Sequence, residues 1–313
     1  MNDPLQQLVL RRLGFENQPA VDLEGLQAIY RAWCANVPFD NVRKMIALRS
    51  NPDSPLPSCQ AVPFFEGWLA GGTGGTCWPT SNALFELLHS LGFAVRRVAG
   101  SMRDLGVVNH ASVKAILDGR EWLVDSSLLT NIALPLNGEV FIHDDPVFPS
   151  EVEPDDSTYV IWSHTPPNSN WLPCRLSRDP ESHASYLARY EESRVRSPFN
   201  QRLYARRNRP GEMVVLLGRT RFSKTVTGVV SRDLSPDEVC EALRRDIGLS
   251  EDVIDEWVRS GSLADSLQPP SGRPPRRSFA DHHPSGDHPR TPHFGGCSKP
   301  EAIRRPRSKT AYS

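Results

Sequence analysis

The chain has 313 residues and a formal net charge of −1, and 38% of its residues are hydrophobic. This length allows a large apolar core and about two domains. The nearly neutral charge gives no electrostatic basis for binding nucleic acid or an anionic membrane surface. No apolar run approaches the roughly 18 residues that a membrane span needs, and two arginines interrupt the first apolar segment. We therefore expect a cytoplasmic protein with no membrane partner.

Six cysteines are scattered along the chain without CxxC or other paired spacing. This distribution is too sparse for a disulfide framework or a zinc site, and it is typical of reduced thiols. We therefore expect no metal in this protein.

Residues 1–93 carry the pattern of a helical bundle. Apolar side chains recur at helical spacing within residues 5–13, 23–33 and 80–91. Gly14 and Gly92 stand where the first and third of these patterns stop, as expected at helix ends.

Residues 94–180 change to short apolar runs separated by turn signals, which predicts an antiparallel sheet or barrel. In residues 181–262, a helix near 182–193 precedes strands in 212–218 and 220–228, and two further helices follow. Ser235 and Glu238 form the capping-box pattern at the start of the first of these.

Residues 263–313 are rich in proline and basic residues and contain few large apolar ones. Such a segment buries too little surface to offset its ordering entropy, so we predict a disordered basic tail with an unknown partner. The fold class is therefore α+β with this tail.

Cys77 follows a glycine-rich stretch, GGTGGTC at 71–77, and precedes a helical pattern. Glycines let the backbone approach a substrate closely, and the free amides of a helix start favour a thiolate or an oxyanion nearby. Pro79 suits the first helical turn. The alternative is a buried structural cysteine beside a flexible loop.

A base for this thiol and its orienting group lie in NHASVKAILDGREWLVD at 109–125. Asp118-Gly119 is a strong hairpin signal, and a two-residue turn there pairs residues whose numbers sum to 237. Ser112 then lies opposite Asp125, and His110 is the diagonal neighbour of Asp125 on the same face, with Cβ atoms up to ~7–8 Å apart. A three-residue loop would place His110 and Asp125 on opposite faces.

The order Cys, His, Asp and five motifs resemble the arylamine N-acetyltransferase family. NVPFDN at 36–41 is similar to the I/V-P-F-E-N segment of that family, and TGGTC at 73–77 is similar to its R-G-G-x-C stretch. The segment 109–125 resembles its histidine strand, turn and aspartate strand. SPFN at 197–200 and the LLGRT segment at 216–220 resemble its third domain, so the similarity covers about residues 1–260.

This resemblance implies a helical bundle, a β-barrel and an α/β lid around a cysteine-proteinase-like core. It implies acetyl-CoA as the acyl donor and a small-molecule amine as the acceptor. Cys77 would be the acyl-accepting nucleophile, His110 the base and later the acid, and Asp125 the group that fixes the imidazole tautomer in a ping-pong reaction. Phe39 and Trp78 would bind substrate, although Phe39 could instead be a core aromatic.

The chain departs from the family pattern at four places. Thr73 replaces the arginine before Gly-Gly, and Asp40 replaces a longer glutamate, so a charge pair between these positions is lost. The family's C-aromatic-E-x-N becomes CWPTSN at 77–82, and its V-G-F-G after the aspartate becomes SSLL at 126–129.

Three functions therefore remain open. The first is an N-acyltransferase, including a relative that transfers or cyclises a larger acyl thioester, as in the amide-synthase branch. The second is a transglutaminase- or papain-like hydrolase of amides, since the same Cys-His-Asp order serves that chemistry. The third is a catalytically silent binding module on the same fold.

Overall fold

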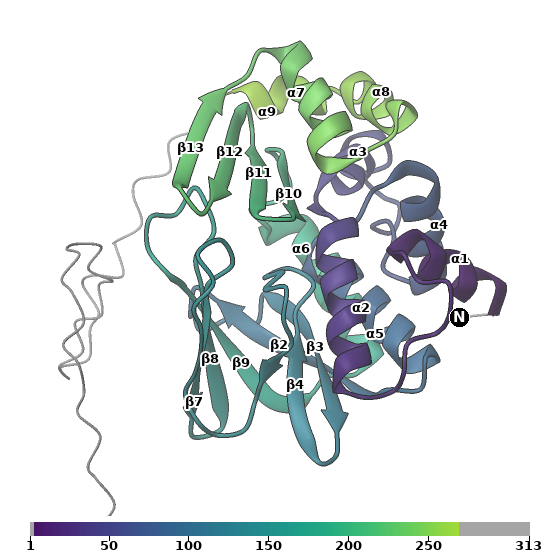
Figure 1. The fold of residues 1–313 in the computed structure, drawn as a ribbon. Helices are drawn as coiled ribbons and strands as arrows, with labels where there is room; N and C mark the ends of the chain where they lie inside the picture. The colour runs from purple at the N-terminus through teal and green to yellow at the C-terminus, as the bar shows by residue number, and fades with distance from the viewer. Residues whose placement is uncertain (1–2, 269–313) are drawn as a thin grey trace, which may run out of the picture. The chain divides into compact units, whose positions relative to one another are not determined.

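The structure is a computed structural model that describes residues 3–268, and these belong to one compact unit. Figure 1 shows helices along one side of this unit, a curled sheet below and a smaller sheet above. The boundaries expected near residues 93 and 180 fall between elements, because one helix ends at Ser90 before a strand from Ala94, and another strand ends at Pro180.

Five helices precede the first long strand. The expected patterns form α1, α2 and α5, whereas α3 and α4 were not predicted. Pro63 and Gly67 lie within α4 and disfavour helix there, but Phe64, Phe65 and Trp68 stabilise it by burial. The bounds are α1 (Asp3–Leu13), α2 (Leu23–Asn36), α3 (Val42–Ser50), α4 (Ala61–Gly71) and α5 (Cys77–Ser90).

Eight antiparallel strands form the curled sheet, in the order β5-β4-β3-β2-β9-β8-β7-β6, which is a nearly closed barrel. The predicted antiparallel barrel is therefore confirmed. The strands are β2 (Ala94–Met102), β3 (His110–Leu117), β4 (Arg120–Val124), β5 (Leu134–Pro135), β6 (Phe141–His143), β7 (Ser150–Asp155), β8 (Thr158–Ser163) and β9 (Leu172–Pro180).

A second sheet joins a short strand from the N-terminal part of the chain to four strands from its C-terminal part. Its order is β1-β10-β11-β12-β13, so Phe39 and Asp40, which form β1, pair with Arg206 and Ala205 of β10. This pairing was not predicted from the sequence. The strands after β1 are β10 (Tyr204–Arg209), β11 (Glu212–Leu217), β12 (Thr220–Thr225) and β13 (Gly228–Asp233).

Helices flank this second sheet. The capping box of Ser235 and Glu238 is present at the start of α7, as predicted. The remaining helical elements are α6 (His183–Arg196), α7 (Pro236–Ala242), the π-helical η1 (Leu243–Ile247), α8 (Glu251–Arg259) and α9 (Ser262–Leu267).

The prediction of disorder from residue 263 onward is wrong for the first residues of that segment. They form α9, in which the Ser266 hydroxyl oxygen accepts a hydrogen bond from Leu203 N at 3.0 Å. Leu263 and Leu267 pack against an apolar cluster. Residues 269–313 of the predicted tail lie outside the described residues.

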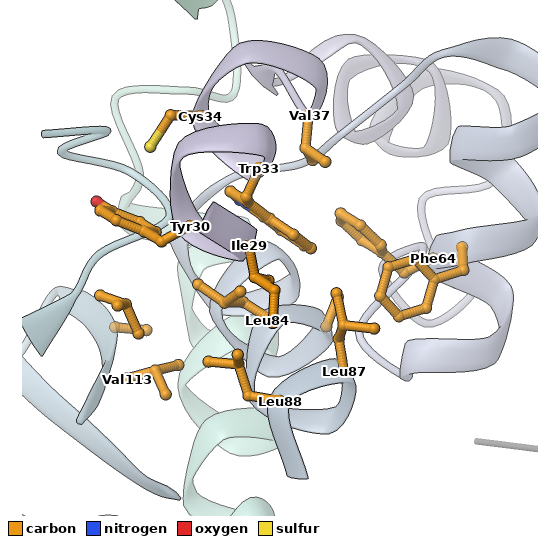
Figure 2. Packing of buried hydrophobic residues seen from close by; sticks show 14 of the residues in the cluster. Ile29, Tyr30, Trp33, Cys34, Val37, Phe64, Leu84, Leu87, Leu88 and Val113 are labelled. Carbon is orange, nitrogen blue, oxygen red and sulfur yellow. The ribbon is translucent and has the colours of Figure 1, made fainter. Parts of the chain in front are cut away.

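The main apolar core lies between α2, α4, α5 and the barrel strand β3. Figure 2 shows Trp33 and Phe64 side by side, with Leu84, Leu87 and Leu88 of α5 directed toward the same space. The Trp33 and Phe64 rings stack with centroids 6.1 Å apart. Because α5 contributes one face to this core, its first residue, Cys77, is held in a fixed position.

Within residues 3–268, the helices are all too short or too polar to cross a bilayer.

Leu87 tests how much this core contributes to stability. Leu87→Ala should lower the free energy of unfolding by about 2–5 kcal/mol, because the side chain is fully buried and the change leaves a cavity. Leu8→Ala, at an exposed site on α1, should change it by less than about 0.5 kcal/mol. Urea unfolding of both variants measures the difference, and equal losses would contradict the assignment of Leu87 to the core.

Candidate active site

Cys77 is the first residue of α5, which begins three residues earlier than expected, and only 7% of it is exposed. Its thiol lies 3.8 Å from the carbonyl oxygen of Asn109, the residue before the barrel strand β3. The sulfur therefore lies where α5 meets the barrel.

The glycine loop before Cys77 approaches the chain's own backbone closely. A side chain at Gly74 would place its Cβ 1.8 Å from the Pro38 carbonyl oxygen, so only glycine fits. The backbone N–H of Asp40 donates to the Gly75 carbonyl at 3.1 Å. From the sequence, we expected these glycines to let the backbone approach a substrate. Gly74 is instead required by the close approach of the chain's own backbone at Pro38.

Asp40 and Arg43 fix this loop despite the missing family arginine. The buried carboxylate of Asp40 accepts the Gly74 N–H at 2.7 Å, and Arg43 Nε donates to the Thr73 hydroxyl at 3.0 Å. Burial raises the pKa of Asp40 to about 6, against the opposing effects of its hydrogen bonds and of the Arg43 charge. Arg43 therefore supplies positive charge near the place where the sequence lost it.

The hairpin register derived from the sequence is confirmed. Val113 pairs with Val124 and Leu117 with Arg120, and both couples sum to 237. The turn residues Asp118 and Gly119 have φ of 49° and 73°, as a type I′ turn requires. His110 and Asp125 consequently meet: His110 Nε2 lies 2.7 Å from Asp125 Oδ2.

The buried His110–Asp125 pair is strongly coupled. Burial alone would lower the pKa of His110, but the Asp125 charge and hydrogen bond raise it well above its usual value. Burial likewise opposes the charge of Asp125, and His110 outweighs it, so the pKa of Asp125 is lowered. A smaller contribution that raises the pKa of His110 comes from Cys77, and since Nε2 faces Asp125, Nδ1 is the nitrogen left for the thiol.

The other oxygen of Asp125 and its backbone are also fixed. Asp125 Oδ1 accepts the backbone N–H groups of Ser127 and Leu128, each at 2.8 Å. The Tyr30 hydroxyl of α2 donates to the Asp125 carbonyl at 2.7 Å and lies 3.2 Å from the Asp125 amide. Sequence reasoning missed Tyr30, because its helical pattern fits a core aromatic equally well.

Hydroxyl groups tie the three segments of the site together where the family pattern is altered. Ser126 Oγ lies 2.9 Å from both Ser81 Oγ and Thr80 Oγ1 of α5. The Ser81 hydroxyl also reaches the carbonyl of Ala111, the residue after His110, at 2.8 Å. This hydroxyl network (Thr80, Ser81, Ser126) joins α5 to the segments that carry His110 and Asp125.

The turn after Asp125 keeps an unusual backbone although its glycines are absent. Leu129 has a φ of 48°, in the left-handed region that disfavours side chains. Its carbonyl accepts from Asn208 Nδ2 at 2.7 Å and from the buried Arg206 at 3.4 Å. Side chains of β10 thus hold the turn in the conformation that glycine would adopt readily.

Phe39 and Trp78 are both buried close to the site. The Phe39 ring packs edge-on against Phe199 and Tyr204, with centroids 5.2 and 5.6 Å away. The Trp78 ring meets Tyr186 of α6 at 5.1 Å. These contacts place both residues in the packing around the nucleophile.

No group of three or more histidine, cysteine, aspartate or glutamate side chains suited to a metal ion occurs in the part of the chain that the structure describes.

The fold and site define a class of proteins in which a helix carries a cysteine against a histidine–aspartate pair on a β-barrel. A family model described as N-acetyltransferase matches residues 22–254. The chain therefore belongs to the arylamine N-acetyltransferase family.

Two curated relatives match parts of the chain. Proansamycin X synthase of Amycolatopsis mediterranei is 28% identical over 121 residues, which are 37% of this chain and 45% of the relative. An arylamine N-acetyltransferase of Mycolicibacterium smegmatis is 30% identical over 91 residues, 29% of this chain and 31% of the relative. The chain thus aligns with less than half the length of either.

Solved structures share the fold over most of the chain. An arylamine N-acetyltransferase of Mycobacterium smegmatis has a TM-score of 0.74 at 18% identity and covers 86% of this chain and 100% of its own. That of Mycobacterium marinum, solved in complex with CoA, has a TM-score of 0.73 at 17% identity and covers 84% of this chain and 99% of its own. The expected arrangement of bundle, barrel and α/β segment is therefore confirmed.

Asp125→Asn tests the coupled pair. Without the carboxylate, burial should dominate, so the pKa of His110 should fall from its raised value in the wild type. NMR titration of the His110 ring measures this, with the half-buried His143 as a control whose midpoint should not move. An unchanged His110 midpoint would contradict the coupling.

The same pair predicts a pH window for stability. The raised pKa of His110 contributes stability that is complete below about 6.5 and is lost as pH rises through the folded value. The lowered pKa of Asp125 contributes stability that is complete above about 3.8 and is lost at lower pH. The stability gap between wild type and Asp125→Asn should therefore be widest between about pH 4 and 6.5.

Ser126→Ala tests the hydroxyl network. It removes two hydrogen-bond contacts in a buried place, so it should lower the free energy of unfolding by about 1–3 kcal/mol and slow the alkylation of Cys77. The neighbouring Ser127 is the matched control, because its buried hydroxyl has no hydrogen-bond partner among the described residues. Equal effects of Ser126→Ala and Ser127→Ala in unfolding and alkylation assays would refute the role of the network.

Proposed function

We propose that this protein is an acyltransferase that moves an acetyl group, or another acyl group, from a CoA thioester to a small-molecule amine through an acyl-Cys77 intermediate. The observation that carries this proposal is the convergence of Cys77, His110 and Asp125, with Nε2 of His110 only 2.7 Å from the carboxylate. Membership of the N-acetyltransferase family supports the same conclusion.

In the first half-reaction, the thiol proton of Cys77 passes to Nδ1 of His110 before the attack, as the raised pKa of that ring favours, and the sulfur then attacks the thioester carbonyl. The amides at the start of α5 are placed to stabilise the oxyanion that forms. When the tetrahedral intermediate collapses, the carbon–sulfur bond to CoA breaks, and the CoA thiolate receives the proton from His110.

In the second half-reaction, the amine attacks the thioester carbonyl of acyl-Cys77. His110 accepts the proton of the amine and returns it to the cysteine sulfur as the amide product leaves. Asp125 keeps Nε2 protonated through both steps, so that Nδ1 always faces the sulfur. Phe39 and Trp78 are proposed to bind substrate beside Cys77.

A CoA thioester as the donor is supported by the Mycobacterium marinum structure, which has the same fold and is described as a complex with CoA. A larger acyl thioester is the second candidate. The similarity to Proansamycin X synthase, a relative named for a synthesis and not for acetyl transfer, keeps this candidate open.

The two remaining alternatives predict different chemistry. An amide hydrolase would cleave a peptide amide and would form no acyl-enzyme from acetyl-CoA. A silent binding module would leave the thiol of Cys77 unreactive toward both. Family membership favours acyl transfer over either.

The test is to mix the protein with acetyl-CoA in the absence of an amine and to locate acetyl groups by peptide mass spectrometry. We expect one acetyl group on the peptide that contains Cys77, none in Cys77→Ala, and formation at least about 100-fold slower in His110→Asn. Cys240→Ala, which removes a more exposed thiol, should be labelled as the wild type is.

A parallel reaction with a longer acyl thioester identifies the preferred donor. Labelling by that thioester alone would favour the larger acyl group, and absence of labelling by either would overturn the proposal.

A further inference from the structure

A buried lysine that the sequence did not single out lies within electrostatic range of the proposed nucleophile. Lys44 is in the first turn of α3, and only 3% of it is exposed. The chain just before it is fixed to the glycine loop, since Asp40 N donates to Gly75 O two residues before Cys77. Lys44 and Cys77 therefore extend from two segments that are hydrogen-bonded to each other.

Helix α6 packs against Lys44 and against Trp78, the residue after Cys77. Tyr186 and Tyr190 lie one turn apart on one face of α6 and are both buried. The Tyr186 ring contacts Trp78, the neighbour of Cys77, and the Lys44 ammonium lies over the Tyr190 ring, 5.6 Å from its centroid. The charge of Lys44 accordingly interacts with the Cys77 sulfur.

The Lys44 ammonium is held by neutral groups. Nζ donates to Ser193 Oγ at 2.7 Å and to the Ser193 carbonyl at 3.3 Å. Ser193 Oγ donates its own proton to the Tyr190 carbonyl at 2.6 Å, so its lone pairs face Lys44. The carboxylate that acts on Lys44 from α6, Glu191, is engaged by Leu56 N and by Arg194.

We propose that Lys44 is a specificity-determining residue, which makes the Cys77 site favour substrates that carry a carboxylate close to the reacting group. This rests on the proposed function for the identity of the reaction, but the electrostatic preference itself belongs to the thiol and can be measured without turnover. A buried ammonium attracts an anion that enters the site more strongly than an exposed one would, because water screens it less.

The preference should depend on pH. Burial lowers the pKa of Lys44 to about 8, with Cys77 and Glu191 raising it and Arg194 lowering it. The ammonium is therefore present below about pH 8 and is lost above it. Tyr190, the other titratable group against Lys44, has a pKa raised well above its usual value and stays neutral across this range.

The experiment compares two alkylating reagents of the same size, anionic iodoacetate and neutral iodoacetamide. The rate of modification of Cys77 by each is followed by peptide mass spectrometry. Their rate ratio cancels the common reactivity of the sulfur and reports the local charge. In Lys44→Met, the ratio of iodoacetate to iodoacetamide rates should fall at pH 7 by about threefold or more.

Two variants serve as controls. Lys44→Arg keeps the charge and should keep the wild-type ratio. Lys224→Met removes another buried lysine whose pKa is also lowered to about 8, by burial and by Arg206, but whose ammonium contacts His164 instead. It should leave the ratio unchanged. Circular dichroism checks that each variant is folded.

The wild type supplies a second measurement, because its rate ratio should fall toward that of Lys44→Met as pH rises through about 8. A ratio that is equal in wild type and Lys44→Met, or one that does not change with pH, would overturn the inference. Because His110 also loses positive charge near Cys77 as pH rises, the wild-type profile is compared with that of a charge-removing variant, and Lys44→Gln replaces Lys44→Met if the latter does not fold.

Turnover then tests the substrate class. If acyl-Cys77 forms, 4-aminobenzoate should lose more of its acceptor rate in Lys44→Met than neutral 4-aminobenzamide does, and equal losses would overturn the inference. If acetyl-CoA never labels Cys77 while the alkylation ratio still depends on Lys44, the proposed acetyl transfer fails and the charge preference stands.

Discussion

The ionised carboxylate of Asp125, buried between the barrel and α2, is the constraint on which the site depends. Only 1% of it is exposed, and a buried charge costs several kcal/mol unless it is neutralised and hydrogen-bonded. His110 supplies the charge, and the amides of Ser127 and Leu128 supply the remaining donors. His110 contacts one oxygen of the carboxylate, and the two amides donate to the other. The requirement that stabilises Asp125 therefore also fixes the orientation of the imidazole and directs its free nitrogen to Cys77.

Where the chain lacks the arginine, the glutamate and the glycines of the family motif, short hydrogen bonds between polar side chains are present instead. Where a glutamate and glycines are absent, Thr80, Ser81 and Ser126 connect three segments by hydroxyl groups. A hydroxyl can both donate and accept, so a small network closes without introducing another buried charge. Where an arginine is absent, Arg43 reaches the Thr73 hydroxyl from α3. These contacts hold Cys77, His110 and Asp125 in place by different interactions, which explains how the site is assembled although the motif is altered.

More of the site than of the surrounding fold could be predicted from the sequence, because the interactions that form the His110–Asp125 pair join residues close together in the chain. The meeting of His110 and Asp125 follows from a two-residue turn and the alternation of strands, both of which are local. The pairing of β1 with β10 joins residues more than 160 positions apart, and no local pattern encodes it. The helix α4 contains Pro63 and Gly67, so its propensity is poor, and burial of its aromatic side chains decides its structure. Tyr30 has the helical spacing of a core residue, and only the folded chain reveals what its hydroxyl contacts.

The segment from Phe39 to Lys44 both pairs with the second sheet and places two charged side chains close to the site. Asn41 uses its amide to hold the carbonyls of Phe199 and Arg202, and it accepts the amide of Tyr204, so it fixes the segment to the second sheet. With the backbone fixed in this way, Asp40 is brought under the glycine loop and Lys44 is brought against α6. Both side chains are almost fully buried, since 1% of Asp40 and 3% of Lys44 are exposed. The positions of Asp40 and Lys44 thus depend on contacts that Asn41 of the same segment makes near the second sheet, which contributes none of Cys77, His110 and Asp125. The C-terminal third of the described chain therefore has a role in the surroundings of Cys77.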